Sequence, residues 1–349
     1  MPVTRLRATL ALGLVLAGVL GLLGATVRVP FVALGDGPTF DVLGTGADGR
    51  TVVEVSGPVP VYPAGGQLRM TTVAVTTQVT LFGAMVMWAS GEEQVLPRES
   101  VYPPGRSSEQ VDQENTRQFA QSETDAEAAA LRHLGYPTAV QVGAVLDGSP
   151  SAGLVAPGDR IVAVDGRPVT TPQEVVDALA PTRPGQTVTV TVQRGPLGAP
   201  GPRTDVAVVA AARPDGDPRG FLGVTPTNVV DSPVDVRISL GDVGGPSAGL
   251  VFASAIVDKL TPGDLTGGHV VAGTGTIDAL GRVGDIGGIR FKMDAARHDG
   301  ATVFLVPAGN CAEAVTAVPE GMQLARVGTL SEGITALQAV REGRPPAPC

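Results

Sequence analysis

The fold of this chain is decided by the segment Gly244-Gly245-Pro246-Ser247-Ala248-Gly249 and by the apolar run that follows it at 250–257. Two glycines and a proline predict a tight turn. The run after the turn is apolar on all sides, so we expect a buried helix that begins near Ser247. A serine there lies beside unpaired backbone N–H groups and the positive end of the helix dipole, which suit a nucleophile and an oxyanion. The alternative is that Ser247 only caps a core helix.

Lys292 favours the catalytic interpretation. The chain has 25 basic residues, of which only Lys259 and Lys292 are lysines. Arginine cannot act as a neutral base in a protein, whereas a lysine desolvated in apolar surroundings can. Lys292 lies in a predicted helix that follows a glycine turn and closes at Gly300, with Phe291 among its apolar neighbours. The alternative, a solvated helix lysine, suits Lys259 better, because that residue lies about 18 Å along the helix from Ser247.

These segments, together with Ala-Gly-Thr-Gly-Thr-Ile at 272–277, resemble the α/β proteolytic domain of Lon-type (S16) proteases over roughly 232–340. The resemblance implies a Ser–Lys dyad, with Ser247 as the nucleophile and Lys292 as the general base. It also implies a supporting role for Thr274, which matches the threonine of the family's Thr-Gly-Glu segment. The backbone N–H groups of Gly245, Ser247 and Ala248 are the expected oxyanion donors.

The chain departs from the Lon pattern at two positions. Gly244 stands where the family has an acidic residue, and Thr276 stands where it has the glutamate of Thr-Gly-Glu. Whether Asp242 substitutes for the first acidic residue stays open. Neither departure touches the dyad.

The N-terminal segment, residues 1–30, predicts a membrane anchor. Arg5 and Arg7 precede an uncharged run at 8–27, which is about long enough to cross a bilayer as one helix. The positive flank predicts an inside N-terminus and an extracytoplasmic remainder. A cleaved signal peptide is the alternative. We favour the uncleaved anchor because no Ala-x-Ala precedes a polar segment.

Residues 31–135 show no chemistry of their own. Alternation predicts strands at 51–55 and 67–82, and a helix is expected over 107–134. An apolar stretch at 81–89 is either a core helix or a turn against the membrane, since it is too short to span one. From strand order, we conjecture that this region supplies the early part of the Lon-like fold.

Residues 136–213 resemble a PDZ domain, a barrel-like β-sandwich, most specifically through Pro-Gly-Asp-Arg-Ile-Val-Ala-Val-Asp-Gly at 157–166. Such a domain binds an extended peptide by strand addition between a strand and a helix. The resemblance implies a groove formed by Tyr136, Val140, Val142 and Val176, with Val175 or Leu179 as further helix candidates. A module with a blocked groove is the alternative. The Lon-type domain would then cover 214–340, and a tail 341–349.

An α+β chain with an anchor, a PDZ domain and a Lon-type domain resembles the YlbL-like family of membrane-bound bacterial serine peptidases. That resemblance implies cleavage of flexible extracytoplasmic polypeptides, and an oligomer is expected because Lon-type domains tend to form rings. No Gly-x-x-x-x-Gly-Lys-Ser/Thr occurs, so peptidase activity would be independent of ATP. The second class of function is an inactive anchored scaffold that binds C-terminal tails through the PDZ groove, for which Gly244 is the support.

Other chemistries find little support in the sequence. The net charge of −9, without a basic block, argues against a nucleic-acid partner. Three scattered histidines, His133, His269 and His298, give no metal-ligand spacing and no sound Ser-His-Asp triad, so we expect no cofactor. Cys311 and Cys349 form either one disulfide or a pair of free thiols.

Overall fold

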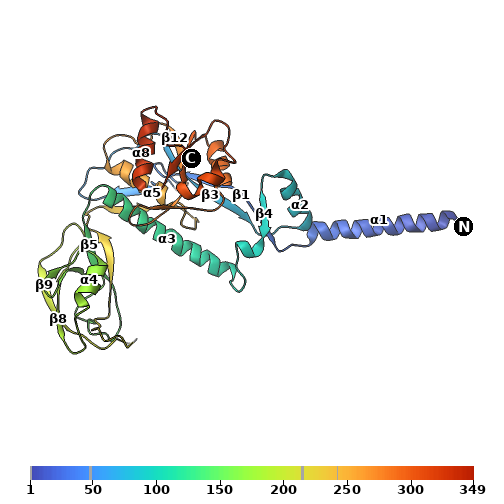
Figure 1. Cartoon of the computed structure of the whole chain (residues 1–349). Coiled ribbons are helices and arrows are strands. Elements are labelled where there is room, and N and C mark those ends of the chain that lie inside the picture. Colours follow the sequence, from blue (N-terminus) through green and yellow to red (C-terminus); the bar gives the residue numbers. More distant parts are fainter. Residues whose placement is uncertain (1, 47–48, 214–215, 242) are drawn as a thin grey trace.

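The computed structural model describes residues 2–46, 49–213, 216–241 and 243–349, with side chains from residue 9 onward. Figure 1 shows a long N-terminal helix, a larger body of helices around a sheet, and a smaller lobe made mainly of strands. Helices and strands alternate along the chain and pack together in the larger body, so the structure confirms a mixed class of helices and strands with an N-terminal apolar helix.

The N-terminal helix α1 (Pro2–Thr26) is long and apolar enough to cross a membrane. Its segment Thr9–Thr26 has a mean hydropathy of 2.1, and only 6% of that segment is buried within the protein. Eighteen helical residues extend about 27 Å, close to the thickness of a bilayer core. A signal sequence near the N-terminus meets the same criteria of length and composition, so α1 is a possible membrane span.

The larger body is built on a six-stranded sheet in the order β16-β15-β12-β3-β1-β4. β3 pairs in parallel with β12, so strands from before and after the PDZ-like segment share one sheet. β12, β15 and β16 are also mutually parallel, whereas β1 runs antiparallel to both β3 and β4. The strands are β1 (Phe31–Asp41), β3 (Gln67–Thr76), β4 (Gln94–Pro97), β12 (Val270–Gly273), β15 (Val303–Pro307) and β16 (Gln323–Val327).

Helices cover both faces of this sheet. Successive residues of a strand point to opposite faces, so one strand can contribute side chains to both helical layers. In β15, Val303 and Leu305 join a core with one set of helices, whereas Phe304 and Val306 join a second core with the other set. The first set is α3 (Ser108–His133), α5 (Gly249–Leu260) and α8 (Leu330–Arg341), and the second is α6 (Ile289–His298) and α7 (Cys311–Ala314). Phe119 of α3 meets Phe252 of α5 edge to face, with ring centroids 5.7 Å apart.

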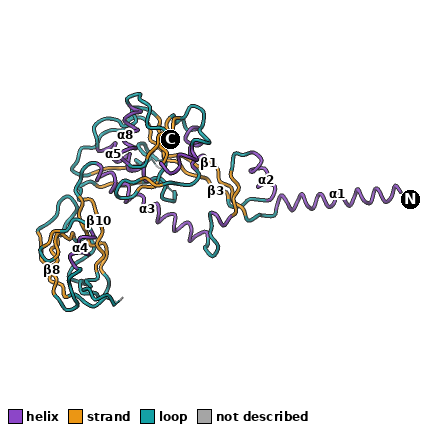
Figure 2. The backbone as a smooth tube through the Cα atoms, viewed as in Figure 1, coloured by secondary structure: helices purple, strands orange, loops and turns teal. Residues whose placement is uncertain are grey.

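The smaller lobe has its own sheet and core (Figure 2). Its order is β10-β5-β6-β8-β9, with β7 paired to β6, and every pairing in it is antiparallel. The elements are β5 (Thr138–Val145), β6 (Arg160–Val164), β7 (Arg167–Pro168), α4 (Pro172–Leu179), β8 (Thr187–Gln193), β9 (Arg203–Val209) and β10 (Val224–Val230). Thr171 and Glu174 form a capping box that fixes the start of α4.

The last strand of the lobe, β10, lies beyond the expected end of the PDZ segment at Arg213. It pairs with β5 from Val224 to Val230, and Leu222 just before it is buried in the core of the lobe. The expected boundary at 213/214 therefore precedes the last strand of this sheet. Pro214 and Asp215 themselves lie outside the described residues.

Shorter elements complete the body. The expected strand at 51–55 is β2 (Val53–Ser56), which pairs with β11 (Asp235–Ile238), and β13 (Thr276–Ile277) pairs with β14 (Val283–Gly284). The apolar stretch near 81–89 is a helix, α2 (Leu81–Ser90), and so ends the expected strand 67–82 at Thr76. Two 3-10 turns, Arg98–Ser100 and Ala308–Asn310, precede α3 and α7.

The C-terminal tail is attached to the body. Cys349 forms a disulfide with Cys311, the first residue of α7, and Arg326 N donates to the carbonyl of Ala347 at 2.8 Å. Of the two states left open for these cysteines, the structure therefore has the disulfide.

Candidate active site

Three side chains meet at the carboxyl end of the central strand β12. Lys292 Nζ lies 2.8 Å from Ser247 Oγ and 2.9 Å from Thr274 Oγ1. Ser247 precedes α5 on one face of the sheet, Lys292 lies on α6 on the other face, and Thr274 follows β12 directly. The structure thus brings together the three side chains that the sequence predicts for a Ser–Lys site.

The amine of Lys292 is buried, with 3% of the residue exposed. Burial disfavours its charged form and lowers its pKa from 10.5 to about 8. A hydroxyl group at 2.8 Å is within reach of direct proton transfer to an amine that is neutral near this pH. The solvated-lysine alternative therefore does not describe Lys292.

The end of β12 holds the serine turn in place. The carbonyl of Ser247 accepts hydrogen bonds from Gly275 N at 2.8 Å and from Thr274 Oγ1 at 3.0 Å. Gly275 has a φ of +152°, which disfavours other residues, and a Cβ there would come 2.9 Å from Val283. Thr274 thus contacts both the amine and the backbone of the serine, and so fixes their separation.

The helix after the turn begins at Gly249, slightly later than the expected start near Ser247. Since Thr274 and Gly275, just after β12, engage the carbonyl of Ser247, the first carbonyl used by the helix is that of Ala248, which accepts from Val251 and Phe252. Ala248 is the N-cap residue, and no side chain caps the helix there. The hydroxyl of Ser247 therefore does not cap α5 and is directed to Lys292.

Helix α3 supports the turn from the other side, which the sequence analysis missed. Asn115 O accepts from Gly245 N at 3.0 Å, and Ser122 Oγ donates to the carbonyl of Pro246 at 3.1 Å. In the sequence, only the spacing of Asn115 and Ser122 indicates a shared contact, because residues seven apart lie on one face of a helix. The hydrogen bond from Gly245 N to Asn115 O removes Gly245 from the expected oxyanion donors, because its N–H is already engaged within the protein. For the N–H groups of Ser247 and Ala248, no acceptor is found within the described residues.

A cleft runs from β1 and β3 to the amine of Lys292. Its wall at the turn includes Gly244, where a Cβ would come 3.0 Å from Asn115 Cβ. Any side chain at position 244 would therefore crowd α3, which accounts for glycine here. Asp242, the other acidic candidate, lies outside the described residues. The cleft is lined by Pro38, Phe40, Thr72, Val73, Val243, Gly244, Gly287 and Lys292.

Two histidines that a Ser-His-Asp triad could use, His298 and His133, contact residues other than Ser247. His298 is largely exposed and lies 3.6 Å from Asp36, and His133 Nδ1 contacts Ser331 Oγ at 3.2 Å. Across the described ranges, no cluster of three or more His, Cys, Asp or Glu suits a metal ion.

The expectation that Lys259 is solvated is wrong. Only 9% of this residue is exposed, and its Nζ lies 3.5 Å from the carbonyl of Leu43. Burial lowers its pKa, although Asp258 and Asp41 oppose that effect. The reason is that α5 is buried through its last turn by residues far away in the sequence.

The PDZ-like groove lies elsewhere than expected. Val140 and Val142 are 0% and 1% exposed in the core of the lobe, and Tyr136 packs against the core of the larger body. β5 is an inner strand between β10 and β6, so it has no free edge to which a peptide could pair. The two edge strands are β10 and β9, and of the four expected groove residues only Val176 lines the cavity beside β10.

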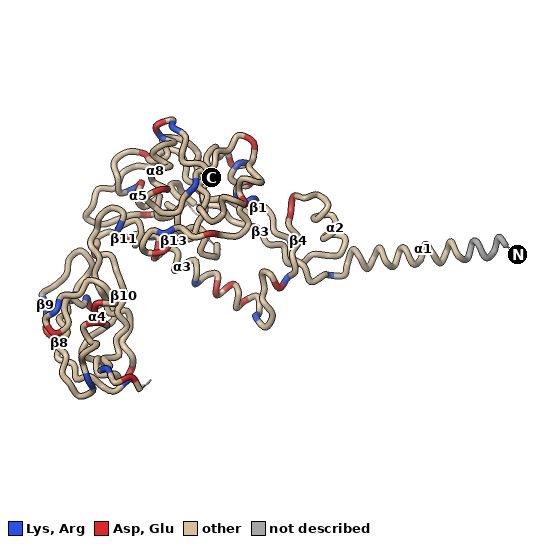
Figure 3. The backbone as a smooth tube through the Cα atoms, in the orientation of Figure 1, with Lys and Arg blue, Asp and Glu red and all other residues tan. Residues whose placement is uncertain are grey.

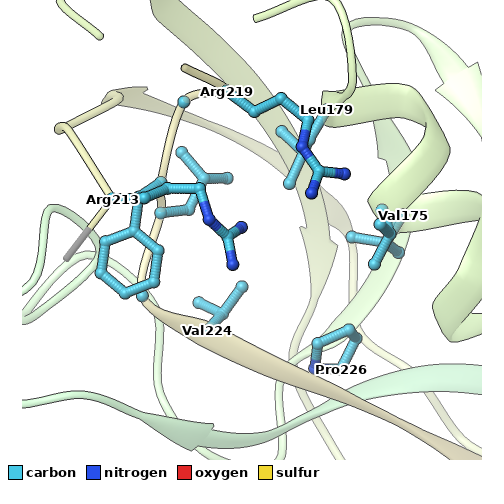
Figure 4. A pocket seen from close by; sticks show the side chains of 11 residues that line it. Val175, Leu179, Arg213, Arg219, Val224 and Pro226 are labelled. Atoms are coloured by element: carbon cyan, nitrogen blue, oxygen red, sulfur yellow. The ribbon is translucent and has the colours of Figure 1, made fainter. Parts of the chain in front are cut away.

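The observed cavity lies between α4 and the loop that leads into β10. Figure 4 shows Val175, Leu179, Val224 and Pro226 around it, with the guanidinium groups of Arg213 and Arg219 directed into it. Arg219 pairs with Asp217, and Arg213 lies over the ring of Phe221 at 6.0 Å. The sequence signal for this rim was Arg-Gly-Phe-Leu-Gly-Val at 219–224, which the expected boundary assigned to the next domain.

Comparison with known proteins supports both parts. The model of the Lon protease (S16) C-terminal proteolytic domain matches residues 221–336, and the PDZ domain model matches residues 141–194. A Lon protease of Phenylobacterium zucineum is 37% identical over 94 residues, which cover 26% of this chain and 12% of that protein. A Lon protease of Campylobacter concisus is 44% identical over 66 residues, 19% of this chain and 8% of that protein. The matched segments thus span a small part of these relatives.

Solved structures match the lobe. The PDZ domain of the SdrC-like protein from Listeria monocytogenes is 23% identical, covering 26% of this chain and 87% of that one, with a TM-score of 0.22. The solution structure of GtR34C from Geobacillus thermodenitrificans is 32% identical, covering 25% and 94%, with a TM-score of 0.22. The assignment of the PDZ domain rests on the family match at residues 141–194.

The family match and the relatives identify a Lon-type (S16) proteolytic domain in the C-terminal part of this chain. The chain thus combines a segment that matches the PDZ domain, a segment that matches the Lon protease (S16) C-terminal proteolytic domain, and an N-terminal helix long enough to span a membrane. The residues at 31–135 lie outside the matched Lon segment, although β1, β3 and α3 complete its sheet and support its serine turn.

Proposed function

We propose that this chain is an ATP-independent serine endopeptidase with a Ser247–Lys292 dyad. The observation that carries the proposal is the 2.8 Å contact between Ser247 Oγ and the amine of a buried lysine whose pKa is lowered to about 8. Burial alone accounts for that shift, so an appreciable fraction of the amine is neutral at physiological pH.

The mechanism is acyl transfer through the serine. The neutral Lys292 amine takes the proton of Ser247 Oγ while that oxygen attacks the scissile carbonyl carbon. The N–H groups of Ser247 and Ala248 stabilise the resulting oxyanion, and a donor of this kind is worth about 3–4 kcal/mol. Lys292 then returns the proton to the leaving amine, the acyl-enzyme forms, and water releases the second product.

Thr274 is a positioning residue in this scheme. Its hydroxyl contacts both the lysine amine and the serine carbonyl, at 2.9 and 3.0 Å. Geometry held to within fractions of an ångström accounts for a large part of enzymatic rate enhancement.

The PDZ lobe binds the C-terminal end of a substrate at the edge of β10. Apolar side chains of α4 and β10 suit a terminal apolar residue, and the guanidinium groups of Arg213 and Arg219 suit its carboxylate. Strand addition at β10 follows from its edge position.

The peptidase is anchored by α1 and acts outside the cytoplasm on flexible or unfolded polypeptides. Support for that side of the membrane comes from the basic residues before the apolar run and from the Cys311–Cys349 disulfide, since disulfides persist in oxidising compartments. The chain has no P-loop sequence, so unfolding of substrates by ATP hydrolysis has no source within it. Assembly into a homo-oligomer is part of the proposal by analogy with Lon-type domains.

The test is cleavage of casein and of a quenched fluorescent peptide by the full chain in detergent micelles. Ser247→Ala should abolish cleavage, whereas Ser56→Ala, at an exposed serine of β2, should leave it unchanged. Equal behaviour of wild type and Ser247→Ala, with no cleavage by either, would instead favour the anchored scaffold that binds C-terminal tails.

A further inference from the structure

Helix α2 presents apolar side chains that the protein does not cover. Its sequence, Leu-Phe-Gly-Ala-Met-Val-Met-Trp-Ala-Ser, has no charge, and none of its residues is buried. Val86 is 67% exposed and Trp88 is 76% exposed, and Leu81, Phe82 and Met85 are exposed as well. Figure 3 shows this helix free of charged residues, and α1 is likewise free of charge from Thr9 onward. A contiguous apolar surface of this kind marks an interaction site.

This surface is continuous with the end of the candidate membrane span. A Cβ on Gly24 of α1 would come 2.5 Å from the ring of Phe82, so glycine allows the two helices to touch. Arg28, just after α1, forms an isolated antiparallel β-bridge with Thr80, and the side chain of Thr80 caps the start of α2. In Figure 1, α2 lies beside the end of α1 nearest the body and turns across its direction.

We propose that α2 lies in the lipid–water interface of the bilayer that α1 spans, with lipid as the partner that covers its apolar side chains. This inference rests on the proposed anchoring by α1. Ten helical residues extend about 15 Å, too short to cross a bilayer but sufficient to lie in its interface. Trp88 suits this depth, because tryptophan is enriched where one side of a residue is apolar and the other wet. Glu92 and Glu93 follow the helix and keep its end at the water side.

The contact with lipid bears on the active site through α6. Arg290 of α6 donates a hydrogen bond from Nη2 to the carbonyl of Gly91, the C-cap residue of α2. Lys292 follows two residues later on α6. A helix held in the interface would therefore fix the height and orientation of the catalytic cleft above the membrane.

Trp88 is the only tryptophan in the chain, so its fluorescence reports directly on α2. We would reconstitute the full chain into phosphatidylcholine–phosphatidylglycerol vesicles, with and without phosphatidylcholine brominated on its acyl chains. The expected result is a blue-shifted emission, quenching by the brominated lipid to less than about half, and weak quenching by aqueous iodide. Emission typical of water, with strong iodide quenching and no effect of brominated lipid, would overturn the proposal.

Matched variants make the result specific. Trp88→Phe combined with Leu146→Trp moves the probe to an exposed site on the PDZ lobe, where iodide should quench and brominated lipid should not. Met85→Glu with Val86→Glu should expose Trp88 to iodide, since both side chains are already exposed and the change leaves the core intact. Protection from iodide without quenching by brominated lipid, together with cross-linked dimers, would show that a second copy covers α2 and would also overturn the proposal.

Anchoring by α1, catalysis by the dyad and the position of α2 can each be tested separately. Resistance of the vesicle-bound chain to carbonate extraction reports on α1, and peptide cleavage reports on the dyad. A chain that resists extraction and cleaves peptide while Trp88 stays wet would overturn the role of α2 alone. Loss of the chain on extraction would overturn the anchoring and, with it, the position given to α2.

Discussion

At the scale of single residues, the account depends on one amine that can lose its proton near neutral pH. Lys292 has no acidic partner among the causes of its shifted pKa, and desolvation alone lowers the value. An acidic neighbour would hold the amine charged and useless as a base. The surroundings supply hydroxyl groups instead, from Ser247 and Thr274.

The pH dependence of cleavage follows from this lysine. Since activity requires the neutral amine and its pKa is about 8, kcat/KM should rise about tenfold per pH unit up to pH 7 and level off above pH 8. Initial rates of peptide cleavage from pH 5.5 to 9.5 at constant ionic strength would measure the profile. A profile flat between pH 6 and 9 would speak against Lys292 as the base.

The same burial makes the lysine a cost to stability. Between pH 8 and 10.5 the unfolded chain binds the lysine proton and the folded chain does not, so this residue makes stability rise with pH across that window. Below pH 8 the penalty is complete, about 3 kcal/mol.

Lys292→Met should therefore abolish cleavage and yet stabilise the protein. We expect the free energy of unfolding to increase by about 1–3 kcal/mol at pH 7, because an apolar side chain of similar length carries no desolvation penalty. Thermal unfolding at pH 7 and at pH 10 would test this, and the gain should be much smaller at pH 10. An equal change at both values would mean that proton binding is not its cause.

At the scale of elements, α3 links the N-terminal half of the chain to the catalytic turn. It holds Gly245 and Pro246 through Asn115 and Ser122, and packs on α5 through Phe119. The serine turn is thus fixed by two elements, α3 and the end of β12, that come from opposite sides of the PDZ segment in the sequence.

Ser122→Ala tests the role of α3. Loss of the hydrogen bond to the Pro246 carbonyl should cost about 1 kcal/mol and lower kcat about fivefold with little change in KM. Thr124→Ala is the matched control, because the Thr124 hydroxyl is exposed and bonds within its own helix, to Ala120. Should both variants keep the full kcat, α3 would have no part in positioning the serine.

Physical reasons separate what the sequence predicts from what it does not. Ser247 and Lys292 are candidates from the sequence because one follows a glycine-proline turn before an apolar run and the other lies among apolar neighbours, whereas their pairing and the role of Thr274 are implied by the resemblance to Lon-type proteases. The groove is not predictable, because whether β5 or β10 is an edge strand depends on pairing between strands about 85 residues apart. The burial of Lys259 is missed for the same reason, since Leu43 reaches it from the other end of the chain.

At the scale of the whole molecule, the PDZ lobe and the catalytic cleft are separate parts (Figure 1). The lobe has its own core, and its groove between α4 and β10 is lined by no residue of the cleft. Binding in the groove should therefore raise the local concentration of substrate without changing the chemical step.

Val176→Asp should thus raise KM, by about tenfold, for a long peptide with a free apolar C-terminus and leave kcat unchanged. Amidating that C-terminus should weaken binding to the wild type and remove the difference between the two proteins, because the carboxylate partner of the arginines is lost. Val209→Asp, at an exposed valine of β9 on the far edge of the sheet, is the control. A change in kcat instead of KM would indicate that the lobe does not act by recruitment.

Replacement of Lys292 by arginine shows whether a neutral lysine activates Ser247. Lys292→Arg keeps the positive charge and much of the length but cannot accept a proton near neutral pH. Cleavage of a fluorescent peptide by the full chain at pH 8 should fall to the level of Ser247→Ala, with both variants folded as judged by thermal unfolding. Cleavage by Lys292→Arg at a rate near that of the wild type would contradict the account.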